Sequence, residues 1–157
     1  MACLKYLRMI LVSFVLLSVC ACATPDKAAV SVYSSASNLA MQNDAKQMLI
    51  TMLNQYAQGE ISLAQQWLEE DMMGRQVIID NMQQSHVQQK QIELKLSDTT
   101  MAQTNDTVMI QITWEKRFLR IPTMQAQLKQ GKTQFLLTSK HAIWKLVGMS
   151  GDNVFAP

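Results

Sequence analysis

Cysteine and histidine side chains are common ligands of transition metals, and a cysteine thiolate is a strong nucleophile. The cysteines are Cys3, Cys20 and Cys22, and the histidines are His86 and His141. A disulfide between Cys20 and Cys22 would close a very small, strained ring. A metal site would need further ligands at suitable spacing, and neither the cysteines nor the histidines have them. The sequence therefore predicts no disulfide, no metal and no cofactor.

The segment before these two cysteines has the order of features of a secretory signal. Lys5 and Arg8 supply positive charge, and residues 9–21 are apolar except for two serines. This run is shorter than the roughly 20 apolar residues that a membrane-spanning helix needs. We therefore predict a signal peptide over residues 1–21.

The end of this segment resembles a bacterial lipobox, in which a cysteine after small or branched residues receives lipid. Ala21 fits the small protease subsite before the acceptor better than Val19 does. This favours Cys22 as the lipidated residue, with Cys20 as the alternative. The resemblance implies a lipoprotein that carries three acyl chains such as palmitate. Ala23, where an Asp would favour inner-membrane retention, points to an outer-membrane anchor with the body in the periplasm.

Residues 22–37 are small and polar, with one proline, which predicts a flexible tether. About 15 flexible residues would reach on the order of 20 Å from the membrane surface. The alternative is a short edge strand over residues 29–33. The folded domain is then expected over residues 38–157.

Three segments with helical periodicity open this domain. The first starts near Asn38 or Asp44 and ends at Gly59, and its apolar face contains Ala45, Met48, Leu49, Met52 and Tyr56. The second is short, with an inner face of Ile61, Ala64, Trp67 and Leu68. The third spans residues 75–89, with Ile78, Met82 and Ser85 on one side, although residues 77–79 could instead form a strand.

From Gln91 onward the apolar period changes to two, which is typical of half-buried strands. The alternating inward positions are Ile92, Leu94 and Leu96, and then Ile110, Ile112, Trp114 and Phe118. Pro122 is expected at a bulge or an edge, and residues 130–132 are expected to form a turn. Two more strands follow at residues 134–139 and 142–150. Helices followed by an antiparallel meander predict an α+β domain, with three helices packed on a curved sheet of about four strands.

The stretch Gly131–Phe155, GKTQFLLTSKHAIWKLVGMSGDNVF, together with this order of elements, resembles the nuclear transport factor two-like superfamily. The resemblance covers residues 38–157 and implies a cystatin-like cone, a curved sheet closed by helices. This superfamily contains enzymes, ligand binders and assembly components, so the fold alone does not choose among them.

Charge is distributed unevenly along the chain. Residues 22–115 carry five Lys/Arg and eleven Asp/Glu, whereas residues 116–157 carry seven Lys/Arg and one acid, Asp152. No run of five like charges occurs, and no aromatic residues alternate with the bases as in a nucleic-acid-binding face. We therefore expect the two halves to attract each other and predict no nucleic-acid partner.

Enzymes of this fold place an acid or base inside the cone, and the candidates here are Asp80, His86, Asp106 and Glu115. A second possibility is a soft apolar pocket for a small ligand, lined by Met48, Met52, Trp67, Met82 and Trp114. For the methionines, core packing is the ordinary alternative. We expect surface carboxylates and a turn histidine rather than catalysis, so the chain is predicted not to be an enzyme.

The predicted function is a non-catalytic component of an envelope complex such as a secretion or pilus system, by analogy with periplasmic domains of type IV secretion components. Contacts to unidentified envelope proteins are expected at strand edges and at a basic face of Lys116, Arg120 and Lys145. Phe155 would either close the cone or add an exposed contact. The alternatives are a carrier or sensor of a small apolar ligand and, third, a small-molecule isomerase or hydrolase.

Overall fold

The computed structural model describes residues 26–157, with side chains from residue 36 onward. The elements are α2 (Asp26–Gln58), α3 (Ile61–Gln65), α4 (Arg75–Gln88), β1 (Gln89–Thr104), β2 (Thr107–Arg120), β3 (Gln125–Lys140) and β4 (Ile143–Gly151). The predicted signal peptide and the candidate lipid acceptors Cys20 and Cys22 lie outside the described residues. Among the helices of the described part, none is long and apolar enough to cross a membrane. The folded unit discussed below is Ser37–Pro157.

Helix α2 begins earlier than the sequence predicts. It starts at Asp26, so residues 26–37, expected to be a flexible tether with an edge strand as the alternative, are helical. No proline or glycine occurs between Pro25 and Gly59, and nothing in the local sequence therefore interrupts a helix. Asn38 and Asp44 lie within α2, so the prediction that one of them caps its start is wrong.

The predicted ends and inner faces of the helices are largely confirmed. Gly59 follows α2 with φ +83°, a left-handed conformation that glycine adopts at helix ends without strain. The five predicted core residues of α2 are all buried, as are Ile78, Met82 and Ser85 on α4. Helix α3 is shorter than expected and ends at Gln65. Leu68 lies beyond it and forms an isolated parallel bridge with Leu146 of β4.

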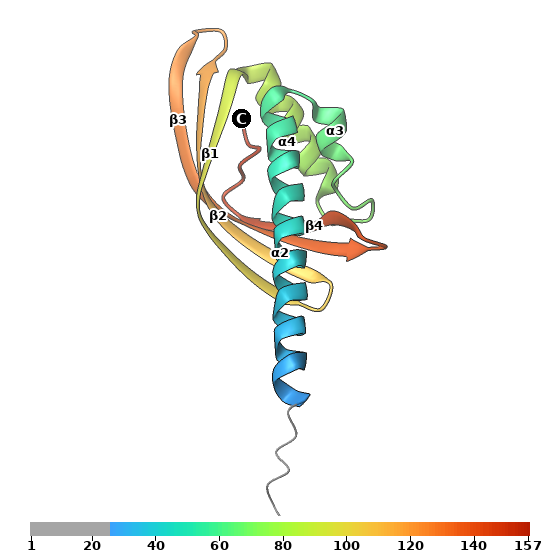
Figure 1. Ribbon diagram of the computed structural model, residues 1–157. Helices are drawn as coiled ribbons and strands as arrows, with labels where there is room; N and C mark the ends of the chain where they lie inside the picture. Colours follow the sequence, from blue (N-terminus) through green and yellow to red (C-terminus); the bar gives the residue numbers. More distant parts are fainter. Residues whose placement is uncertain (1–25) are drawn as a thin grey trace, which may run out of the picture. The chain divides into compact units, whose positions relative to one another are not determined.

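The four strands form one antiparallel sheet in the order β1-β2-β3-β4, as the predicted meander requires. Within the folded unit, the helices lie against the concave side of this curved sheet, and the last residues of the chain run between the two layers (Figure 1). The inner face of β2 is buried at every second residue, namely at Val108, Ile110, Ile112, Trp114, Lys116 and Phe118. We call the opposite side the outer sheet face.

Two expectations for the sheet are wrong. Residues 130–132 do not form a turn but lie inside β3, where Gly131 pairs with Trp114. A Cβ atom on Gly131 would lie 2.5 Å from Cζ2 of Trp114 and 2.7 Å from Cβ of Asp152, so glycine is needed for close packing. Pro122 lies in the turn between β2 and β3 rather than at a bulge or an edge.

Candidate functional site

A polar cluster lies inside the folded unit, where α2, α4 and β2 meet the last residues of the chain. We call Tyr56, Ser85, His86, Lys116 and Phe155 the Lys116 cluster. Tyr56 comes from α2, Ser85 and His86 come from α4, and Lys116 comes from the inner face of β2. All except His86 are buried completely. Buried polar groups need partners, and here the backbone of other segments supplies most of them.

Lys116 is the charged residue of this cluster. Its Nζ donates a hydrogen bond of 2.5 Å to the carbonyl oxygen of Ala156 and one of 3.4 Å to the Tyr56 hydroxyl. The same nitrogen lies 5.6 Å from the ring centre of Phe118 and 5.9 Å from that of Tyr56. Burial lowers the pKa of Lys116 to about 7, and repulsion from Lys129 adds to this decrease.

The other polar groups of the cluster are also engaged. Burial raises the pKa of Tyr56 to about 12, and a hydrogen bond with Ser85 offsets part of that increase. The Ser85 hydroxyl donates to the carbonyl oxygen of Phe155 at 2.6 Å, and Nε2 of His86 lies 2.6 Å from the carbonyl oxygen of Tyr56. The Tyr56 ring meets His86 and Phe155 edge-on, with ring centres 5.4 and 5.0 Å apart.

The buried amine of Lys116 could be either a reactive group or a structural one. A lysine with a pKa near 7 is partly neutral at neutral pH and could in principle act as a base or nucleophile. Such chemistry requires access to a substrate, and here the Lys116 side chain is 0% exposed and its amine donates to the carbonyl oxygen of Ala156. Lys129 is held in a similar way, because its Nζ donates to the carbonyl oxygen of Pro157. The geometry therefore fits a structural clasp on the last residues better than an open reaction centre.

A small cavity of about 40 Å³ lies beside this clasp. Phe118, Lys129, Pro157 and Gln89 are among the residues that line it. Oε1 of Gln89 is buried and has no hydrogen-bond partner among the described residues. A space of this size holds water rather than an organic substrate, and water would satisfy the amide oxygen.

The sequence analysis gives four possible partner contacts, and two of them do not lie on the surface. Lys116 and Phe155 are both 0% exposed. For Phe155, the alternative that it closes the cone is the one that the burial supports. Arg120 is exposed, and Lys145 is half-buried with its Nζ donating to the carbonyl oxygen of Gln66. The burial of Lys116 could have been predicted from the sequence. Alternation along a strand puts Lys116 on the same inward face as Trp114 and Phe118.

The residues predicted to line an apolar pocket belong mainly to the packed core. Met48, Met52, Met82 and Trp114 are all buried in one hydrophobic cluster. Trp67 is partly buried, and its Nε1 donates to Oε1 of Gln55 at 2.7 Å. The structure thus places four of the five in the packed core.

The candidate acid and base residues are dispersed. Asp80 lies exposed on α4, where it accepts a hydrogen bond from Gln76, and Asp106 lies exposed in the turn between β1 and β2. His141 lies in the turn between β3 and β4. In the part of the chain that the structure describes, no three His, Cys, Asp or Glu side chains gather as metal ligands.

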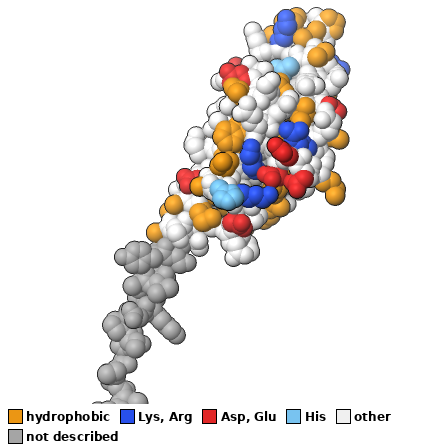
Figure 2. Space-filling model, turned by 90° about the vertical axis from the view of Figure 1, so that its right-hand side faces the viewer, with side chains coloured by type: hydrophobic (Ala, Val, Ile, Leu, Met, Phe, Trp, Pro, Cys, Tyr) orange, Lys and Arg blue, Asp and Glu red, His pale blue; other side chains and the backbone are white. Residues whose placement is uncertain are grey.

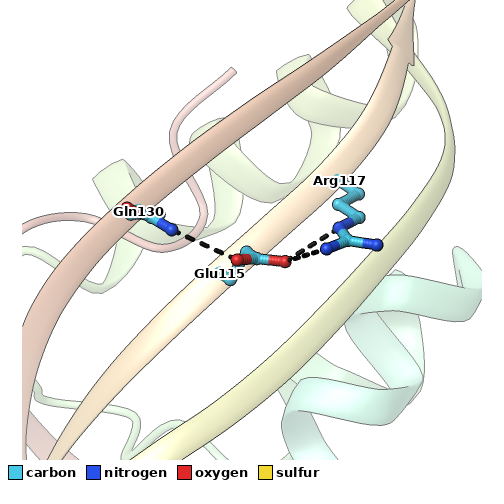
Figure 3. A network of polar contacts seen from close by, with 3 residues as sticks. All are labelled: Glu115, Arg117 and Gln130. Atoms are coloured by element: carbon cyan, nitrogen blue, oxygen red, sulfur yellow. Dashed lines mark hydrogen bonds and ion pairs between the residues drawn. The ribbon is translucent and has the colours of Figure 1, made fainter.

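The outer sheet face carries a polar network of its own. Figure 3 shows Glu115 on β2 between Arg117 of the same strand and Gln130 of β3. Arg117 Nη2 lies 2.7 Å from one carboxylate oxygen of Glu115, and Gln130 donates to the other oxygen at 3.1 Å. The hydrogen bond from Gln130, assisted by the charge of Arg117, lowers the pKa of Glu115.

The outer sheet face also carries apolar side chains, one beside this network and one further along β3. Leu128 is 53% exposed and Leu136 is 40% exposed, both on β3. A groove of about 390 Å³ lies at one end of the same face, with Arg117, Leu119 and Leu128 in its wall. The outer sheet face therefore combines half-exposed apolar groups with a fixed ion pair.

Among the described residues, two ion pairs join the acidic and basic halves of the sequence, and the first is the pair of Glu115 with Arg117. Lys140 of β3 forms a 2.9 Å ion pair with Glu69, and this pairing raises the pKa of Lys140. Figure 2 shows one side of the molecule on which side chains of both signs lie among one another. This mixture agrees with the expectation that the two halves attract each other.

Comparisons with known proteins identify the fold. No protein-family model and no curated protein sequence matches the chain. A nuclear transport factor 2-like superfamily protein from Salmonella enterica is 11% identical, with a TM-score of 0.65 over 73% of this chain and 92% of that one. An NTF2-like protein with a cystatin-like fold from Novosphingobium aromaticivorans is 12% identical, with a TM-score of 0.61 over 82% and 90%.

The association domain of C. elegans CaMKII is also similar in structure. It is 12% identical, with a TM-score of 0.58 over 74% of this chain and 98% of that domain. Identities this low establish architecture and not activity. The folded unit therefore has the NTF2-like fold, with helices packed on an antiparallel sheet of four strands.

Proposed function

We propose that this chain is a lipid-anchored outer-membrane lipoprotein whose folded unit is a non-catalytic binding module of an envelope complex, such as a secretion or pilus system. The observation that carries the proposal is the contrast between the two sides of the sheet. On the inner side, the polar groups are used to hold the last residues of the chain. On the outer side, apolar and charged groups remain available to a partner.

The inner side argues against a catalytic role. A general base or nucleophile must reach a substrate within hydrogen-bond distance. The amine of Lys116 and the hydroxyl of Ser85 instead donate to carbonyl oxygens of Ala156 and Phe155. The Phe155 ring packs edge-on against Tyr56 and is 0% exposed, so it fills the interior beside these groups.

The outer sheet face combines apolar side chains with charged ones. Binding surfaces combine apolar side chains with Arg and a polar, solvated rim. Lys95, which pairs with Glu115, and Lys132 on β3 are exposed on the same face and would belong to such a rim. Leu128 and Leu136 supply half-exposed apolar groups, and Arg117 lies in register with Leu128 on the neighbouring strand. The likeness to a domain that associates in another protein adds support by analogy, at the level of fold only.

The anchor rests on the sequence features at the N-terminus. A charged segment, an apolar segment and Cys22 occur in the order that lipidation requires. Replacement Cys22→Ser is expected to release the protein from membranes, as followed by fractionation and immunoblotting. Replacement Cys20→Ser is the matched control and should leave the protein membrane-bound. Release by Cys20→Ser alone would mean that Cys20 carries the lipid.

The binding role is tested by crosslinking in living cells, followed by gentle extraction and mass spectrometry. Leu128→Glu places a charge on the outer sheet face, whereas Val87→Glu places one at a 68% exposed apolar position on α4. We expect envelope proteins to be recovered with the wild type and with Val87→Glu, and to be lost with Leu128→Glu. Recovery of the protein alone, or equal recovery from both variants, would contradict the proposal.

A further inference from the structure

A second cavity lies between α2 and the sheet, away from the Lys116 cluster. We call it the α2 cleft. It has a volume of about 240 Å³, and its walls include Leu49 and Ile50 of α2, Leu96 of β1, and Ile110 and Ile112 of β2, with Lys46 as its charged residue. Lys46 precedes Tyr56 by ten residues, which places the two about 15 Å apart along α2.

The cleft lies beside an irregularity in β1. The pairing of β1 with β2 shifts register between Ser97 and Thr100, and Asp98 has φ +46°. Such a bulge bends a strand and redirects its side chains. Thr99, which lies within this shift, also lines the cleft. The bulge therefore explains why α2 and the sheet are not fully packed together here.

Lys46 is a cation without a partner at this cleft. It is half-buried, and no ion pair or hydrogen bond joins its ammonium to any other described residue. The residues three and four positions away on α2 are Gln42, Asn43, Leu49 and Ile50, so no acid can pair with it along the helix. A half-buried charge beside apolar walls is better satisfied by an anion than by water alone.

We propose that the α2 cleft binds a free single-chain alkyl carboxylate, with the carboxylate on Lys46 and the alkyl chain against Leu49, Leu96 and Ile110. One lysine matches one carboxylate, whereas phosphate groups are better matched by several cations or by the planar fork of arginine. The volume lies just below the range of drug-sized pockets and suits one short chain rather than a two-chain phospholipid. The site is separate from the outer sheet face and does not depend on the proposed binding role.

Photocrosslinking on the full-length protein in phosphatidylcholine nanodiscs tests this proposal. The probe is decanoic acid that carries a diazirine, and the labelled peptides are identified by mass spectrometry. We expect label on the segments around residues 46–50 and 96–99, and competition by unmodified decanoate. Lys46→Gln should reduce this labelling about tenfold, the loss that corresponds to one charge-assisted hydrogen bond. Lys90→Gln, at an exposed lysine of β1, is the matched control and should have no effect.

Further variants and conditions make the result decisive. Ile50→Trp should fill the cleft and block labelling while the fold, checked by circular dichroism, is retained. Labelling that survives Lys46→Gln unchanged, or that falls mainly on the outer sheet face, would overturn the proposal. Complete loss of labelling in phosphatidylglycerol nanodiscs would assign the cleft to a membrane lipid and also overturn it. Recovery of envelope proteins in living cells should be unaffected by Lys46→Gln, so this site and the proposed binding role can fail separately.

Discussion

Three consecutive charged residues of β2 have opposite environments on the two sides of the sheet. Glu115 and Arg117 form an ion pair on the outer sheet face, whereas Lys116 between them is 0% exposed. The outer carboxylate has a lowered pKa because of a hydrogen bond and a nearby charge. The inner lysine has a lowered pKa because burial disfavours its charge. Successive side chains of a strand point to opposite faces. Glu115 and Arg117 therefore pair on the solvent side, while Lys116 between them is removed from water.

The comparison also separates two kinds of contribution to stability. An exposed ion pair is weakened by water, by salt and by the entropy of two long side chains, so it contributes little. The inner side depends on close packing around Tyr56, Phe155 and Lys116, where every removed atom leaves a void or an unpaired group. Substitutions on the inner side should therefore lower the free energy of unfolding much more than substitutions on the outer sheet face.

Phe155→Ala is expected to have the largest effect. The side chain is fully buried and packs edge-on against Tyr56, so its removal should lower the free energy of unfolding by about 3–5 kcal/mol. Urea denaturation followed by circular dichroism measures this loss. Leu128→Ala on the outer sheet face is the control and should cost much less. An equal decrease in the free energy of unfolding for Phe155→Ala and Leu128→Ala would contradict the expected difference between the two sides of the sheet.

The pH dependence of stability should reveal Lys116. Its pKa is about 7 in the folded state against an ordinary value of 10.5, so between these values the unfolded chain binds more protons. The free energy of unfolding therefore gains a term that rises with pH from 7 to 10.5, by at most about 1.4 kcal/mol per pH unit for one proton. Below pH 7 the lysine is protonated in both states, and its contribution is constant.

Lys116→Met should remove this term and flatten the curve of unfolding free energy against pH. Urea denaturation at several pH values from 7 to 10 measures it. Lys132→Met, at an exposed lysine of β3, is the control and should leave the slope of the wild type unchanged. A slope that persists in Lys116→Met would show that another group is responsible.

Gly131→Ala tests the close contact between β2 and β3. The new Cβ would lie within 3 Å of Trp114 and Asp152, so one of them must move. We expect a loss of about 1–3 kcal/mol in the free energy of unfolding, typical of overpacking. Gly148→Ala in β4 is the control, because a Cβ there would meet Leu136 at an ordinary 3.5 Å. A neutral Gly131→Ala would indicate that residue 131 is not packed in this way.

Glu115→Gln should have the smallest effect. It removes the ion pair with Arg117 but keeps a side chain of the same shape on a wet surface. The midpoint of thermal unfolding should remain within experimental error of the wild type at moderate salt. A large decrease would mean that the outer sheet face contributes more to folding than its exposure indicates.

Much of the fold could be predicted from local sequence patterns. The spacing of Met48, Met52 and Tyr56 predicts the inner face of α2, and the alternation of Ile110, Ile112 and Trp114 predicts that of β2. Both periodicities reflect the need of one face to be buried. The start of α2 was missed because a short polar segment without glycine or proline is compatible with helix as well as coil.

The candidate site was harder to predict than the fold. Lys116 and Arg120 look equivalent as basic residues of one strand, yet only Lys116 is buried. Alternation separates Lys116 from Glu115 and Arg117, but it places Arg120 in the same inward phase, and it could not name the partners of the amine. Those partners, Tyr56 and Ala156, are 60 and 40 residues away in the chain.

Local sequence patterns are enough to predict the order of helices and strands and which side of each faces inward, because these depend on spacing within a few residues. Only contacts between distant residues show that Gly131 allows close packing rather than a turn and that Phe155 closes the interior. The same long-range contacts place Lys46 at an apolar cleft, where it has no partner among the described residues. These properties depend on residues far apart in the chain that meet only when the sheet curves around the helices, and no local pattern records such contacts.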